Sequence, residues 1–108
     1  MRVLFSIFTL TLLQLSYAQH QPVLISQASG ICEPSIKLDP REPNRLVAGA
    51  VLDYVFYSAD TGRTWIADRL KSDYGVWGDP VIEVDTAGNF YYFHLANPPD
   101  GEWIDRIV

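Results

Sequence analysis

Two groups of residues in this chain have types and spacing that could serve a ligand. Tyr74 and Trp77 lie in an aromatic loop that also carries two glycines, and flat aromatic side chains on such a loop suit stacking against a sugar ring. The alternative is that Trp77 fills the seam between two structural units. Glu33 and Asp79 are carboxylates that each precede a proline and open an apolar stretch. Either one of them faces an internal channel, or both cap the entry of the chain into a sheet.

Metal, thiol and cofactor chemistry is not predicted. Cys32 is the only cysteine, so an internal disulfide is impossible, and beside Ile31 it is expected to be a small buried apolar residue. The two histidines, His20 and His94, form no cluster with it. A formal net charge of −5 without a run of Lys or Arg disfavours binding to nucleic acid or to an anionic membrane.

The first eighteen residues are predicted to be a secretory signal peptide. Met1-Arg2 gives a positive start, residues 3–15 are mainly apolar, and Ser16-Tyr17-Ala18 places small residues where a cleavage site needs them. The alternative is an uncleaved N-terminal anchor. Since no later run is long enough to span a bilayer, we expect a secreted, periplasmic or cell-surface protein cleaved after Ala18.

A short pattern recurs at an offset of 46 residues. Residues 33–39 and 79–85 both read acidic-Pro-x-apolar-charged-apolar-Asp, and each is followed by a turn and an apolar strand. Self-similarity of this length, built from short strands, is typical of β-propeller blades. Four strands are predicted in the first unit and three in the second, at 35–38, 45–52, 54–58, 64–69, 81–85, 89–95 and 103–108.

The predicted strands are apolar on both faces. Tyr54-Val-Phe-Tyr57 and Phe90-Tyr-Tyr-Phe93 have no polar alternate set, whereas a sheet with one face in water would alternate. Such strands belong to a sheet covered on both sides, as blades are when they stack around an axis. No segment after the signal peptide has a sustained helical period, so no helix is predicted.

Ser58-Ala-Asp60-Thr-Gly62-Arg-Thr64-Trp65 joins two of these strands and is predicted to be a tight hairpin turn. The Asp60 carboxylate is expected to accept backbone N–H groups that follow it, and Gly62 to take the positive φ at which the chain reverses. The hydroxyls of Ser58 and Thr64 can bond across the turn. Trp65 supplies a large apolar plate that fixes the hairpin on its neighbour.

This stretch fills every fixed position of S-x-D-x-G-x-T-W and resembles the Asp-box, or bacterial neuraminidase repeat, of sialidase-like β-propellers. The resemblance extends from about Glu33 to the end of the chain. It implies an all-β propeller of sialidase type, of which these residues supply about one and three-quarter four-stranded blades. In that family the box braces the outer turn between the third and fourth strands, so its five fixed residues are expected to be structural.

The resemblance also implies what an active member would carry. Sialidases of this kind hold the substrate carboxylate with arginines and use a Tyr/Glu pair and an acid/base Asp. The Arg-Ile-Pro stretch that carries the first of those arginines is not found here. Asp53 lies five residues before the box, near the place of the acid/base Asp; the alternative is an Asp in a bend between strands.

We therefore expect a signal peptide (1–18), a polar lead-in (19–32) and a partial propeller (33–108) made of one blade at 33–70 and an incomplete blade at 79–108. Because ring closure takes at least four blades, the chain is interpreted as the N-terminal fragment of a longer exported protein whose remaining blades are its partners. Closure by oligomerisation is the alternative. The expected function is that of scaffold in a secreted sialidase-like glycosidase; the alternatives are a non-catalytic propeller that binds a glycan, glycoconjugate or protein, and one used in assembly or sorting.

Overall fold

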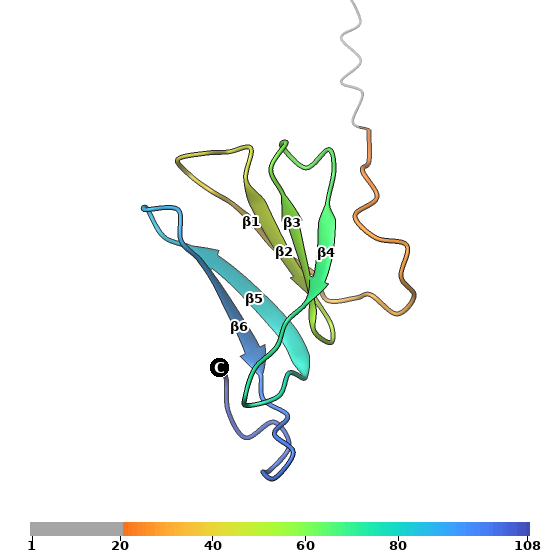
Figure 1. Ribbon diagram of the computed structural model, residues 1–108, viewed down its shortest axis with the longest axis vertical. Coiled ribbons are helices and arrows are strands. Elements are labelled where there is room, and N and C mark those ends of the chain that lie inside the picture. The colour runs from red at the N-terminus through yellow and green to blue at the C-terminus, as the bar shows by residue number, and fades with distance from the viewer. Residues whose placement is uncertain (1–20) are drawn as a thin grey trace, which may run out of the picture.

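The computed structural model describes residues 21–108, so the predicted signal peptide lies outside the described residues. Within them the protein is all-β, as predicted, and no helix is present (Figure 1). The elements are two sheets joined by loops. Their six strands are β1 (Ser35–Leu38), β2 (Leu46–Ala50), β3 (Tyr54–Ser58), β4 (Ile66–Arg69), β5 (Gly78–Val84) and β6 (Phe90–Leu95).

The first four strands form one antiparallel sheet, sheet A, in the order β1-β2-β3-β4. Sheet B consists of β5 and β6, also antiparallel. Short connections between consecutive strands favour this meander, since a tight turn can join only antiparallel neighbours. The register places Ala48 opposite Phe56 in the middle of sheet A, where a small side chain leaves room for the aromatic ring.

The strand bounds agree closely with those predicted in sheet A. β1 and β3 have the predicted bounds, while β2 is shorter at both ends and β4 begins at Ile66. In sheet B, β5 begins three residues earlier than predicted, at Gly78.

The strand predicted at 103–108 is wrong. Residues 103 and 104 are in a turn, and only Ile107 pairs, through a single antiparallel bridge to Leu95. Ile104 has a φ of 57°, a left-handed conformation that a β-branched residue rarely adopts and that an extended strand excludes. The chain therefore turns once more before it reaches the edge of sheet B.

One face of sheet A packs against sheet B. Gly49 in β2 makes this approach possible, because a Cβ there would lie 2.7 Å from the Tyr92 ring and 2.9 Å from Pro80. The Ile82 backbone N–H of β5 donates a hydrogen bond of 2.9 Å to the Ser35 hydroxyl of β1. Figure 1 shows β5 running beside β1 and β2 as these contacts require.

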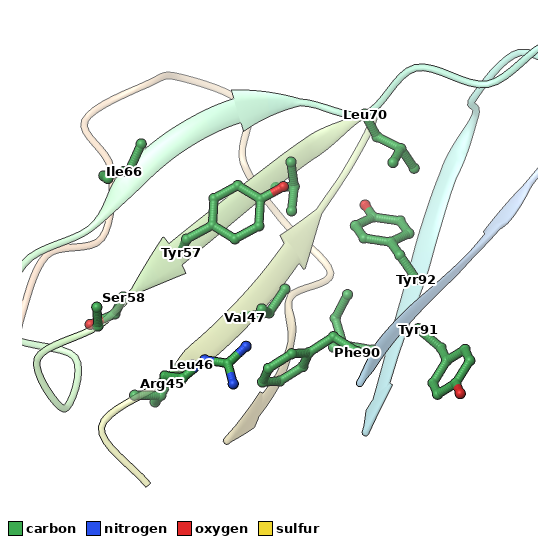
Figure 2. A pocket seen from close by; sticks show the side chains of 13 residues that line it. Arg45, Leu46, Val47, Tyr57, Ser58, Ile66, Leu70, Phe90, Tyr91 and Tyr92 are labelled. Carbon is green, nitrogen blue, oxygen red and sulfur yellow. The ribbon is translucent and has the colours of Figure 1, made fainter. Parts of the chain in front are cut away.

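The opposite face of sheet A is covered by the lead-in. Phe56, Ala48 and Ala50 form a buried cluster there, and Ile25 and Ile31 from the lead-in pack against it. The prediction of sheets covered on both sides is therefore met only in part. β4 is exposed along its whole length, and one face of sheet B, with Tyr91 and Phe93, is open to solvent because no other part of the described residues packs on it. Figure 2 shows Tyr91 pointing away from sheet A, whereas Phe90 and Tyr92 point toward it. Cys32, expected to be buried, is exposed instead, since the chain turns away from the cluster after Ile31.

The repeat seen in the sequence is also a structural repeat. The turns after β1 and β5 are both closed by a backbone bond from the aspartate N–H, Asp39 to the Arg45 carbonyl (2.9 Å) and Asp85 to the Asn89 carbonyl (3.0 Å). Each aspartate also accepts a bond from the backbone N–H two residues on, at 2.8 Å in both turns. β1–β2 and β5–β6 are therefore equivalent strand pairs.

Candidate functional site

The turn at residues 58–65, called the box turn from here on, and the other candidate residues lie at opposite ends of the sheets. In sheet A, Ser58 is level with the end of β1, whereas Val55 is level with its start. Glu33 precedes β1 and Asp53 precedes β3, so both stand at the end away from the box. The loop that leads into β5, with Tyr74 and Trp77, lies at that same end (Figure 1).

The Asp60 carboxylate is the centre of the box turn. Its Oδ1 accepts bonds from the backbone N–H groups of Arg63 (3.0 Å) and Thr64 (2.9 Å), and from the Ser58 hydroxyl (2.9 Å). Its Oδ2 accepts the Thr64 hydroxyl at 2.6 Å. These bonds satisfy donors that the tight turn leaves without a strand partner, which is the role predicted for this residue.

Gly62 and Trp65 form the other hydrogen bonds of the turn. Gly62 has a φ of 80° and donates its N–H to the Ser58 hydroxyl at 2.9 Å. The Trp65 indole N–H donates to the Gly62 carbonyl at 2.9 Å, so the ring covers the glycine. Asn44, in the loop between β1 and β2, accepts the Thr61 N–H at 3.0 Å and joins the box to its neighbour. Every fixed side chain is thus used within the fold.

Substitution of Asp60 by asparagine tests this role. The Thr64 hydroxyl and backbone N–H lower the pKa of Asp60 from its ordinary 3.8 to about 2. Because the folded-state pKa is lowered, the stabilisation is present above about pH 4 and is lost as the pH falls toward 2. We expect D60N to lower the Tm at pH 7 and to flatten the Tm profile between pH 4 and 2. Asp68→Asn, on exposed β4, is the control and should preserve the wild-type profile; a D60N profile as steep as wild type would contradict the role.

Asp53 lies in the bend between β2 and β3, where it forms an ion pair with Arg69 of β4. The Arg69 guanidinium also lies 3.6 Å from the centroid of the Tyr54 ring. Tyr54 stacks in turn on Phe56, with ring centroids 5.7 Å apart. Asp53 and Tyr54 are therefore engaged in contacts that hold the bend to β4.

Glu33 and Asp79, 46 residues apart in the sequence, are brought together by the packing of β1 on β5. A hydrogen bond between the two carboxyl groups, and then their repulsion, raise the pKa of Glu33. Both residues have a positive φ, 52° and 48°, in front of their prolines. Since the folded-state pKa is raised, this pair favours the folded protein at low pH and opposes it as the pH rises through that pKa.

The loop that carries Tyr74 and Trp77 lies at the same end of the sheets as Glu33 and Asp79, and backbone hydrogen bonds fix it to β6 and the residues after it. The Trp77 N–H donates to the Leu95 carbonyl and the Asn97 N–H to the Tyr74 carbonyl, both at 2.9 Å. The Trp77 ring meets Trp103 edge to face at 5.0 Å between centroids. Tyr74 and Trp103 keep 48% and 59% of their surface exposed, so both aromatic side chains are accessible from solvent.

Two residues beside Tyr74 and Trp77 were not predicted to contact a ligand. Trp103 was assigned to a strand, and Arg106, whose guanidinium lies 5.4 Å from the Tyr74 centroid, was not singled out. The signal that could have found them is Pro98-Pro-Asp-Gly101, a strong turn sequence that folds the following residues back toward β6.

Residues 21–108 contain no group of three or more His, Cys, Asp and Glu side chains able to hold a metal ion. His94 is buried, with its Nδ1 2.9 Å from the Leu95 carbonyl. Over the same residues there is no helix long and apolar enough to cross a membrane. Comparison of the chain with family models, with curated proteins and with solved structures finds no match.

Proposed function

We propose that this chain is the N-terminal part of an exported Asp-box propeller of sialidase type, and that the residues described here are scaffold for a glycan-binding face. One observation carries the proposal. The box turn is at one end of the sheets, while the carboxylate pair and the open aromatic faces are at the other.

The propeller part of the proposal is supported by the repeat. β1–β2 and β5–β6 are equivalent pairs, and the first of them is extended by β3 and β4 into a four-stranded antiparallel sheet, the form of a propeller blade. The box occupies the turn between the third and fourth strands of that sheet. The side chains of Ser58, Asp60 and Thr64 all bond within the turn, which favours a structural role for them over contact with a substrate.

The glycan part of the proposal is supported by the opposite end. Tyr74 and Trp103 offer exposed rings, which suit the apolar faces of a sugar. The Glu33 and Asp79 carboxyl groups, which lie together at this end, can hydrogen-bond to a sugar hydroxyl. These groups bind and orient a sugar, but on their own they provide neither an arginine clamp nor a nucleophile of the sialidase kind.

A non-catalytic propeller that binds glycans or proteins at the cell surface is the second candidate. It is favoured by one observation, which is that no Arg-Ile-Pro stretch is found in the sequence. In this case the same end of the sheets would bind the glycan without cleaving it.

The test compares residues 19–108 with the full product of the gene on a fluorogenic sialoside. We expect no turnover from residues 19–108, because the catalytic groups lie outside them, and turnover from a product with further boxes, an arginine cluster and a Tyr/Glu pair. Turnover by residues 19–108 alone would contradict the scaffold role. A product with more boxes, no such cluster and no turnover, yet with tryptophan fluorescence quenched by sialosides, would establish the second candidate.

A further inference from the structure

The loop that follows β6 holds Trp103 against Trp77 (Figure 1). It contains the turn sequence Pro98-Pro-Asp-Gly101, whose last two residues are both exposed to solvent. The loop is closed by a backbone bond from the Ile104 N–H to the Ala96 carbonyl at 3.2 Å. The position of the Trp103 ring therefore depends on the length of the backbone between these two residues.

Asp100-Gly101 is the only place in the sequence where an aspartate or asparagine precedes a glycine. In such a pair the glycine nitrogen can attack the side-chain carboxyl carbon of the aspartate. As the C–N bond forms, one carboxyl oxygen leaves as water with the N–H proton and the carboxyl proton, and a succinimide ring results. Water then opens the ring, and opening at the backbone carbonyl gives isoaspartate. Glycine favours the attack because it has no Cβ to hinder the approach of its nitrogen.

The structure leaves these two groups free to react. Within residues 21–108, neither the Asp100 carboxylate nor the Gly101 N–H has a hydrogen-bond partner. Asp68 lies within β4, and Asp79 precedes a proline, which has no N–H to lose. Other aspartate carboxylates bond to nearby donors, namely those of Asp39, Asp53, Asp60, Asp85 and Asp105.

We propose that Asp100 is a site of spontaneous isoaspartate formation and that its conversion releases Trp103 from Trp77. Isoaspartate adds one carbon atom to the backbone and leaves the carboxylate attached directly to Cα. The lengthened loop no longer matches the span closed by Ala96 and Ile104, so the edge-to-face contact, 5.0 Å between ring centroids, is lost. The reaction needs only water, and the inference is independent of the proposed function.

The test is to age the full chain in neutral buffer at body temperature. Isoaspartate is counted by enzymatic methyl transfer and located by mass spectrometry of peptides. We expect it to form at Asp100 about tenfold or more faster than at Asp73, which is also exposed but is followed by a residue with a Cβ. The Tyr74 N–H that follows Asp73 also donates to the Ser72 hydroxyl at 3.2 Å. Tryptophan emission should shift to longer wavelength in parallel, as the Trp103 ring becomes hydrated.

Two variants at Asp100 make the assignment specific. Asp100→Glu keeps the charge but requires a larger ring, so both the conversion and the emission shift should stop. Asp100→Asn reaches the same succinimide with loss of ammonia and should convert faster than the wild type. Gly101 is left unchanged, because a Cβ there would lie 2.6 Å from Pro98.

Equal rates at Asp100 and Asp73 would overturn the proposal. Conversion of Asp100 without a change in tryptophan emission would overturn the link to Trp103. Neither result would alter the sialoside comparison, which does not depend on this loop reaction.

Discussion

Replacement of Phe56 by alanine is expected to lower the free energy of unfolding by about 4 kcal/mol, the range seen for loss of a buried aromatic ring. Phe56 is 2% exposed and is the largest member of the buried cluster on the lead-in face of sheet A. Its ring also stacks on Tyr54. Alanine leaves a cavity between β2, β3 and the lead-in that the opposed Ala48 is too small to fill. Urea unfolding followed by circular dichroism gives the measurement.

The matched control is Tyr57→Ala, at the next residue of the same strand. Tyr57 is 43% exposed and lies on the opposite face, so its truncation should cost only about 1 kcal/mol. A small domain is stable by only a few kcal/mol, and F56A is therefore expected to be largely unfolded at 37 °C. Equal effects at the two positions would show that the lead-in does not form a core with sheet A.

Replacement of Asp39 by alanine is the second large effect, with an expected loss of about 3 kcal/mol because the backbone N–H groups of the turn and the Arg45 guanidinium lose their acceptor. Asp39 is 1% exposed, and its Oδ2 accepts the Arg45 guanidinium at 2.8 Å. Its Oδ1 accepts the backbone N–H of Arg41 at 2.8 Å. The carboxylate also packs on Gly88 of the second unit, where a Cβ would lie 2.6 Å from Oδ2. The same unfolding assay measures the loss.

Asp85→Ala is the control that the repeat itself provides. Asp85 makes the same turn contacts, but it is less buried and bonds neutral partners, Asn89 and Tyr91, in place of an arginine. Its removal should cost clearly less than that of Asp39. If the two substitutions were equivalent, turn formation alone, and not the burial of the charge against the second unit, would account for the effect of Asp39.

Much of the fold could be predicted because its determinants are local. The box turn follows from Asp60 and Gly62 acting on residues within four positions, and the bounds of β1 and β3 follow from the alternation of turn residues and apolar runs. The recurrence at 46 residues predicted the equivalence of the two strand pairs, which the turns at Asp39 and Asp85 confirm.

Features set by contacts between distant segments could not be predicted in the same way. No residue near Ile104 predicts its left-handed backbone conformation. That conformation follows from the return of the chain to β6, where the Ile104 N–H bonds to the Ala96 carbonyl. Cys32 is exposed because the lead-in covers sheet A with Ile25 and Ile31 instead. The pairing of Trp77 with Trp103 joins two loops that are distant along the chain.

By itself, the sequence determined the all-β class, the tight turn at residues 58–65 and the repeated strand pair, because hydrogen bonds and apolar periodicity within a few residues decide each of them. The tertiary structure alone decided that Glu33 meets Asp79, that the open aromatic rings lie at their end of the sheets, and that one face of sheet B is open to solvent. Those outcomes depend on how the two sheets pack at Gly49 and Ile82. Such packing depends on the shapes of both surfaces, which come from segments far apart in the sequence.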